Sequence, residues 1–195
     1  MTRIIAGAAG GTRLEVPGQG TRPTSDRVRE SLFGALTSMG AIEGARVLDL
    51  YAGSGALALE ALSRGARGAV LVERGRPAAS IVRRNIAAVR KALGGALDAT
   101  VQEGSVRSFL DRATGPFDLV FTDPPYDLSD AEMTADLVTL APLLSADAVV
   151  VVERAKRSTP PDLPAAGLAL IREKVYGDTA LWWAEPAQAS APASR

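Results

Sequence analysis

The stretch DLYAGSG at residues 49–55 combines a carboxylate with two glycines, between an apolar run and a helical pattern. Gly53 and Gly55 permit a tight turn and a close approach of the backbone to a ligand. A loop that ends a strand and opens a helix also presents N–H donors. Glu73 ends the next apolar run, where a carboxylate can accept hydrogen bonds from ribose hydroxyls. Together these residues predict a nucleoside-binding site.

The acid at the start of this loop discriminates between nucleoside ligands. The run GSGALA at 53–58 has alanine at the third glycine position of the dinucleotide pattern, which tolerates it, so NAD is not excluded. The Asp49 carboxylate, however, would repel a pyrophosphate and suits an amino group. S-adenosylmethionine (SAM), which carries an ammonium, therefore fits better. The alternative is that Asp49 only organises the loop.

A second stretch, DPPY at residues 123–126, ends another apolar run. Proline has a fixed φ and no N–H, so the turn offers only acceptors, the Asp123 carboxylate and the carbonyls around Pro124. Tyr126 adds a ring on which a base could stack. Two acceptors that hold both hydrogens of an exocyclic amine make its nitrogen more nucleophilic, so that it can attack a methyl sulfonium. The alternative is a rigid turn without chemistry.

The composition agrees with this chemistry and narrows the partners. The 195 residues include no histidine and no cysteine, which excludes imidazole bases, cysteine nucleophiles and thiolate zinc sites. Lys+Arg and Asp+Glu both total 22, so the composition does not indicate a strongly basic nucleic-acid-binding protein. No apolar run approaches the ~20 residues that span a bilayer. We expect a cytoplasmic monomer without membrane or metal, although an all-oxygen metal site stays open.

Strands and helices must alternate to position these residues. Strands are predicted at 46–50, 69–73, 99–102, 117–122 and 148–153, helices at 56–63, 77–93, 106–110 and 130–144, and a final strand pair at 168–175 and 179–184. Continuous Val/Leu-rich strands between helices indicate a mostly parallel α/β sheet buried on both faces. The last two strands predict an antiparallel C-terminal hairpin. Of Trp182 and Trp183, one is expected in the core and one at the surface.

The chain divides into three parts at this level. Short strands are predicted in RIIAG at 3–7 and TRLEVPG at 12–18, around Gly10 and Gly11, and a helix at 26–39. Residues 1–40 are therefore expected to form a hairpin and helix extension, and 41–186 the main domain. The Ala/Pro/Ser-rich residues 187–195 are expected to be a flexible tail.

With these motifs the sequence resembles class I SAM-dependent methyltransferases that act on nucleic-acid amines. It is most similar to the bacterial RsmD family, through the blocks RIIAG, RPTSDRVRESLF, DLYAGSGALALEALSRGA, VE, DPPY and YGDTALWW. The resemblance runs from Arg3 to about Trp183. It implies a Rossmann-like fold with a seven-stranded sheet. It also implies methylation of a guanine N2 of 16S rRNA within the small ribosomal subunit or its assembly intermediate.

The resemblance also implies roles at matching positions. The RPTSDRVRE block would close over the cofactor, 49–55 would hold the methionine moiety, Glu73 the ribose, and the residues after the third strand the adenine. The implied cofactor residues are Arg22, Thr24, Asp49, Tyr51, Ala52, Gly53, Ser54, Gly55, Glu73, Arg74, Ser105 and Val106. The implied catalytic residues, which would hold the target base, are Asp123, Pro124, Pro125 and Tyr126.

One departure and several alternatives remain. Ser105 follows Gly104 where the family often has an aspartate for the adenine amine; a serine hydroxyl or a backbone carbonyl could replace it. The same DPPY turn serves DNA adenine-N6 or cytosine-N4 methylation. A non-catalytic RNA-binding module and an NAD(P)-dependent oxidoreductase are the alternatives from other classes. The target base must leave its stack to reach the turn.

Overall fold

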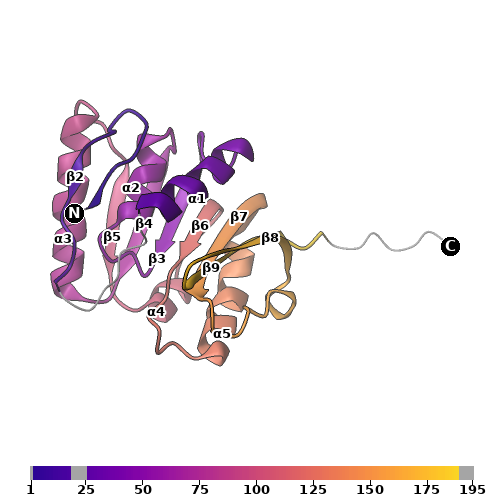
Figure 1. Ribbon diagram of the computed structural model, residues 1–195. Helices are drawn as coiled ribbons and strands as arrows, with labels where there is room; N and C mark the ends of the chain where they lie inside the picture. Colours follow the sequence, from indigo (N-terminus) through magenta and orange to yellow (C-terminus); the bar gives the residue numbers. More distant parts are fainter. Residues whose placement is uncertain (1, 19–25, 189–195) are drawn as a thin grey trace.

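A seven-stranded sheet forms the centre of the molecule (Figure 1). The computed structural model describes residues 2–18 and 26–188. The strand order is β5-β4-β3-β6-β7-β9-β8. The strands are β3 Arg46–Leu50, β4 Gly68–Glu73, β5 Ala99–Glu103, β6 Phe117–Thr122, β7 Leu144–Ala155, β8 Leu168–Tyr176 and β9 Thr179–Pro186. The strands from β3 to β7 pair in parallel, whereas β9 is antiparallel to both its neighbours. This confirms the predicted sheet and its C-terminal hairpin.

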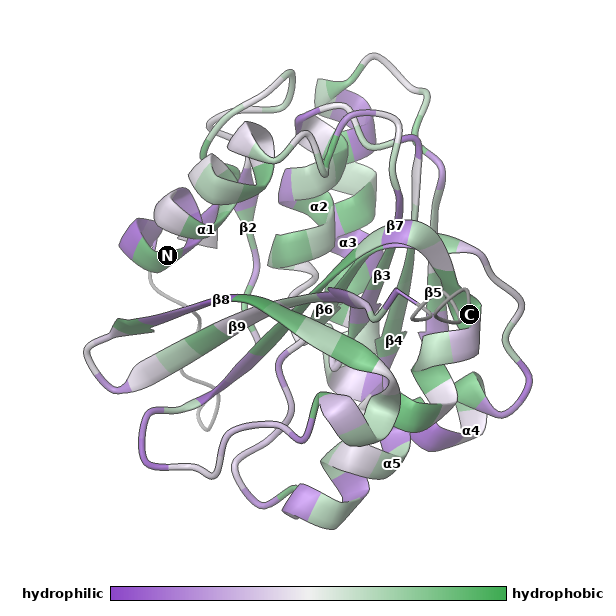
Figure 2. Cartoon of the chain, turned by 90° about the vertical axis from the view of Figure 1, so that its right-hand side faces the viewer, coloured by the Kyte–Doolittle hydropathy of each residue, from purple (hydrophilic) through white to green (hydrophobic). Residues whose placement is uncertain are grey.

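Helices cover both faces of the sheet, as a parallel sheet requires. Helices α1 (Asp26–Ser38), α2 (Ala56–Ser63) and α3 (Arg76–Ala92) lie on one face, and α4 (Val106–Leu110) and α5 (Asp130–Leu140) on the other (Figures 1 and 2). Short 3-10 turns follow at Ala141–Leu143 and Pro164–Ala166. The polar faces of the helices point outward, and the central strands are hydrophobic (Figure 2).

Alternating side chains divide the core into two clusters, one on each face. Val47 and Phe121 belong to the cluster under α1 to α3. Leu48 and Val120, their neighbours along β3 and β6, belong to the cluster under α4 and α5. Successive residues of a strand point to opposite faces of the sheet. A strand with apolar residues in succession therefore indicates a sheet that is covered on both faces.

The prediction for the tryptophan pair was wrong for the same reason. Trp183 is 0% and Trp182 3% exposed, and they belong to opposite clusters. Neighbouring residues do point to opposite faces of β9, but neither face is at the surface.

The helix predicted at 130–144 ends earlier, and the strand predicted at 148–153 is longer. Helix α5 stops at Leu140, and Pro142 lies in the 3-10 turn that follows. Proline lacks the N–H that an interior helix position donates, so the chain leaves the helix there. Strand β7 then begins at Leu144 and runs to Ala155.

The N-terminal hairpin is anchored to α2 by one buried acid. Strands β1 (Thr2–Arg3) and β2 (Arg13–Leu14) are shorter than predicted. The Glu60 carboxylate, fully buried, accepts hydrogen bonds from the N–H groups of Ile5 at 2.6 Å and Ala6 at 3.0 Å, and from Arg64 Nε at 2.7 Å. Side chains of β2 and α1 enter the same core as the sheet. The division of the chain at residue 40 stays a prediction.

We expect Glu60→Gln to destabilise the fold. The amide would turn an NH₂ group toward a backbone N–H, leaving buried donors without an acceptor, at a cost of about 1–3 kcal/mol. Urea unfolding measures this loss. Glu30→Gln, on the exposed side of α1, is the matched control and should change stability by less than about 0.5 kcal/mol. Equal midpoints for Glu60→Gln and the wild type would contradict the anchoring role.

Candidate active site

A cavity of about 820 Å³ opens where β3, β4, β5 and β6 end. Strand β4 pairs with one side of β3 and β6 with the other, so the cavity lies at the point where the strand order reverses. Open α/β sheets bind ligands in this crevice. The predicted site residues in its wall are Asp49, Tyr51, Ala52, Gly53, Ser54, Glu73, Arg74, Ser105, Val106, Asp123 and Pro125.

Five predicted site residues are not placed in this wall. Gly55 and Pro124 are buried beside it, and Tyr126 is 74% exposed. Arg22 and Thr24 lie outside the described residues. Their predicted roles stay predictions.

Strand register brings the two motifs together. Leu50 on β3 is the partner of Thr122 on β6, so the loop after β3 and the turn that begins with Asp123 leave neighbouring strands at the same level. Leu50 is also the partner of Val72 on β4, which places Glu73 on the other side of the loop. The glycine loop therefore lies between the two acids.

The glycine loop is strained and uses its own N–H groups. Gly53 and Gly55 have φ of 57° and 77°, and Tyr51 has φ 64°, a region that favours glycine. A Cβ at Gly55 would lie 2.9 Å from Leu71 Cδ2. The N–H groups of Ala52, Gly53 and Gly55 donate to Val72 O, Glu73 Oε2 and Ala52 O. These three donors are thus not free for a phosphate.

Burial raises the pKa values of the two acids that begin the motifs. Asp49 is 2% exposed, and its Oδ2 accepts from the Ala58 N–H at 3.1 Å. Burial raises the pKa of Asp49 to about 7, helped by Glu73 and opposed by the Ala58 bond. Burial also raises the pKa of Asp123 well above its usual range, and Glu153 and Asp49 add to the effect. A ligand that brings positive charge or N–H donors would relieve this crowding.

A tyrosine–aspartate pair, which the sequence does not reveal, forms another part of the wall. The Tyr51 hydroxyl donates to Asp136 Oδ2 at 2.7 Å. Burial raises the pKa of both groups, and the hydrogen bond opposes the shift at Asp136. The bond joins the glycine loop to α5, whose Glu132 and Asp136 both line the cavity. Their spacing of four residues places them on one side of that helix.

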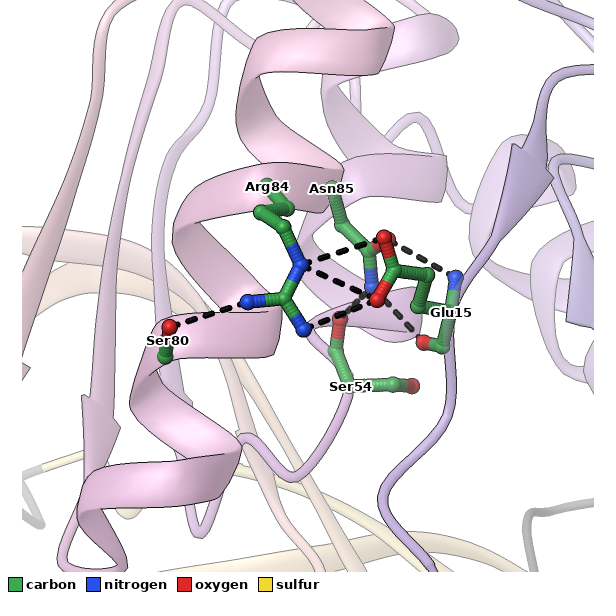
Figure 3. A network of polar contacts seen from close by, with 5 residues as sticks. All are labelled: Glu15, Ser54, Ser80, Arg84 and Asn85. Atoms are coloured by element: carbon green, nitrogen blue, oxygen red, sulfur yellow. Dashed lines mark hydrogen bonds and ion pairs between the residues drawn. The ribbon is translucent and has the colours of Figure 1, made fainter.

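Asn85 joins the N-terminal segment to the glycine loop (Figure 3). Its Nδ2 donates to Glu15 O and Ser54 O, both at 2.8 Å, and its Oδ1 accepts from the Glu15 N–H at 2.8 Å. Outside this buried amide, Arg84 pairs with the Glu15 carboxylate at 2.8 Å. Val16 and Pro17 follow Glu15 directly and line the cavity, so Asn85 holds this part of the wall in place.

The loops after β5 and β6 are each fixed by a polar contact. Ser105 caps α4, because its Oγ accepts from the Ser108 N–H at 3.2 Å. Arg154, buried on β7, donates from Nη2 to Leu128 O at 3.1 Å. Leu128 lines the cavity just beyond the DPPY turn. Arg154 thus supports that turn from the neighbouring strand.

Sequence reasoning missed several wall residues besides the Tyr51 partner. Among them are Thr2, Val16, Pro17, Arg29, Arg107, Asp127, Leu128 and Glu132. Arg29 could have been predicted, because it lies within the RPTSDRVRE block. The other residues reach the cavity wall through tertiary packing, which the sequence does not show. Over residues 2–18 and 26–188, no three acidic side chains are grouped to hold a metal ion. None of the described helices is long and apolar enough to span a membrane.

Comparison with known proteins gives concordant matches. The family model "Conserved hypothetical protein 95" matches residues 2–185. The chain is 41% identical, over 91% of its length and 86% of the relative, to Ribosomal RNA small subunit methyltransferase D of Escherichia coli K12. The solved structure of yhhF from Escherichia coli, provisionally described as a methyltransferase, has TM-score 0.78 and 35% identity over 95% of this chain and 98% of that one.

A more distant structure has the same fold. It is magnesium protoporphyrin IX methyltransferase from Synechocystis with bound SAM, with TM-score 0.66 and 15% identity over 85% of this chain and 86% of that one. At this identity the likeness shows the fold alone. It supports a Rossmann-like methyltransferase architecture.

We expect Asp49→Asn to change how stability depends on pH. The Asp49 pKa rises from 3.8 to about 7 on folding, so the folded state binds an extra proton between these values. Raising the pH across this window therefore lowers stability. Asparagine cannot ionise, so the variant escapes this loss. It should gain on the wild type by on the order of 4 kcal/mol between about pH 4 and pH 8, since the pKa shift is about 3 units and one unit is about 1.4 kcal/mol.

Urea unfolding at the two pH values measures the gain. Asp147→Asn, at an exposed position of β7, is the control and should follow the wild type at both. A difference between Asp49→Asn and the wild type that stays constant with pH would show that the pKa of Asp49 is the same in the folded and unfolded states.

Proposed function

The chain belongs to the family of "Conserved hypothetical protein 95", the RsmD family, and we propose that it methylates the exocyclic N2 of a guanine in 16S rRNA, with SAM as methyl donor. One observation carries the proposal. The acid-led glycine loop and the acceptor-only DPPY turn end neighbouring parallel strands and share one cavity. A methyl donor on the first and an amine on the second would meet there.

The cavity wall fits the parts of SAM. Asp49 begins the loop. Its carboxyl is buried and has a raised pKa, and the ammonium of SAM would favour its ionised form. Glu73 is placed for the ribose hydroxyls. Its Oε2 already accepts from the Gly53 N–H and its Oε1 from the Gly75 N–H, yet each carboxylate oxygen can accept again. Ser105 and Val106, at the end of β5, are placed for the adenine.

The DPPY turn would hold and activate the target amine. Asp123 and the carbonyls around Pro124 accept its two hydrogens, which leaves the nitrogen lone pair directed at the sulfonium methyl. SAM, when bound, would supply an electrophilic methyl group to this nitrogen and leave as the uncharged thioether, and the methylated amine would then lose a proton. Asp123 can take that proton because burial and Glu153 raise its pKa. Positioning and electrostatics would thus supply the catalysis. Tyr126, which is exposed at the turn, would stack on the flipped base.

The substrate is best presented on a preassembled particle. The chain has equal numbers of acidic and basic residues, so it lacks the excess positive charge by which proteins bind naked nucleic acid without sequence preference. A monomer of this kind gains more from the shape of a ribonucleoprotein surface. The small ribosomal subunit or its assembly intermediate supplies one.

An oxidoreductase that uses NAD(P) fits the site poorly. The dinucleotide fold binds a pyrophosphate with free N–H groups of the glycine loop, whereas three of those groups are bonded internally here. Asp49 and Glu73 would add two acids beside the phosphates.

We expect labelled methyl groups to pass from SAM to small ribosomal subunits of a strain that lacks this enzyme. Equal masses of the subunits, deproteinised 16S rRNA and plasmid DNA are compared. Mass spectrometry of the labelled nucleosides should find N2-methylguanosine in the subunits and far less product in the naked RNA. Methylated adenine or cytosine in the plasmid would identify a DNA amino-methyltransferase and overturn the proposal.

We expect Asp123→Ala to lower the rate of methyl transfer by at least about 100-fold, because one of two acceptors of the amine is lost. SAM affinity, measured by calorimetry, should change less than about threefold. Folding should be kept, since the change removes an acid crowded by Glu153 and Asp49. Asp147→Ala, exposed and remote on β7, is the control and should keep full activity. Near-normal turnover of Asp123→Ala would exclude the acceptor mechanism.

A further inference from the structure

Arg29 on α1 is a buried cation whose hydrogen bonds are incomplete. It is 1% exposed and lines the cavity. Its Nη2 donates to Arg3 O at 2.8 Å and to Asp26 Oδ1 at 2.7 Å. Its Nε and Nη1 are buried and have no hydrogen-bond partner among the described residues. The charge of Arg29 is paired with Asp26, but buried charged donors without acceptors are costly, so Nε and Nη1 call for a further acceptor.

The other charges of the cavity wall have the opposite sign or lie in solvent. Asp49, Glu73 and Asp123 supply negative charge at the strand ends. Arg74 and Arg107 also line the cavity, but both are exposed. Arg107 is in addition engaged by Ala135 O and Thr139. Arg29 is therefore the buried cation of the described wall.

SAM has one anionic group among several cationic or hydrogen-bond-donating ones. Its sulfonium, ammonium and ribose hydroxyls match the acids of the cavity. Its α-carboxylate matches none of them and would be repelled by Asp49. A guanidinium with free N–H groups is the usual partner of a carboxylate.

The position of Arg29 agrees with this pairing. Arg29 donates to Arg3 O in the N-terminal segment, and Thr2, Val16 and Pro17 of that segment line the same cavity. Val16 follows the residue that Asn85 joins to the glycine loop. Glu73 and Ser105, at the ends of β4 and β5, mark the nucleoside end of the cavity. Arg29, on α1 near the N-terminal segment, lies at the amino-acid end.

We propose that Arg29 binds the α-carboxylate of SAM, with Asp26 and Arg3 O holding the guanidinium in place. This inference rests on the proposed function. It adds a determinant of cofactor specificity: the protein recognises the amino-acid end of SAM by charge at both groups, with Asp49 for the ammonium and Arg29 for the carboxylate.

The test compares SAM with decarboxylated SAM, which keeps the ammonium and sulfonium but lacks the carboxylate. Calorimetry on the full chain should show that the wild type binds SAM about 10- to 100-fold more tightly, as expected for a charge-assisted hydrogen bond. Arg29→Met should weaken SAM by a similar factor and leave decarboxylated SAM nearly unchanged, so that the preference disappears. Arg90→Met, on the exposed side of α3, is the control and should keep the full preference.

Arg29→Lys guards against misfolding of the methionine variant. It keeps the charge, and circular dichroism should show a native fold; it should retain part of the preference for SAM. An unchanged preference for SAM in a folded Arg29 variant would overturn the assignment. If the KM of that variant for ribosomal subunits rose at the same time, Arg29 would be assigned to RNA binding instead. Equal weakening of both ligands would overturn it too, as the mark of a structural role. A wild type that binds neither ligand would refute the proposed function itself.

Discussion

The parallel pairing of β3 with β6 is the constraint on which the rest of the site depends. Leu50 and Thr122 are partners across these strands, and each is followed by a loop that bears chemistry. Since β3 and β6 are far apart in sequence, the loops can meet only because the strand order reverses between them. The helices, hairpin and core clusters keep this pair of strands straight and buried. No loop geometry alone could bring Asp49 and Asp123 into one cavity.

The same burial that orders the strands also sets the electrostatics of the cavity. Asp49 and Asp123 are drawn out of water, and their pKa values rise as a result. Arg29 has the reverse problem, with buried donors that lack acceptors. A zwitterionic ligand with an additional sulfonium would satisfy both at once. Buried acids of raised pKa and buried donors without acceptors thus favour a ligand of that charge pattern, as expected at functional sites.

Much of this arrangement could be predicted from the residues, because its chemistry is local in sequence. The glycines and the acid of 49–55 are contiguous, as are the acceptors of 123–126, and period and composition indicate the strands that carry them. The contact between Tyr51 and Asp136 could not be predicted, since it joins residues 85 positions apart. The internal use of the loop N–H groups was equally hidden. The prediction that one of Trp182 and Trp183 lies at the surface was wrong because both faces of β9 are covered, which the strand pattern does not show.

The clasp formed by Asn85 has a practical consequence for handling the protein. The Asn85 side-chain amide forms two hydrogen bonds with the backbone of Glu15, as a neighbouring strand would, and also donates to Ser54 O. Thr2, at the start of the same N-terminal segment, is itself part of the cavity wall. The N-terminal segment is therefore part of the cavity wall and not an appendage to it. Affinity tags and fusion partners are therefore better placed at the other end of the chain, after β9.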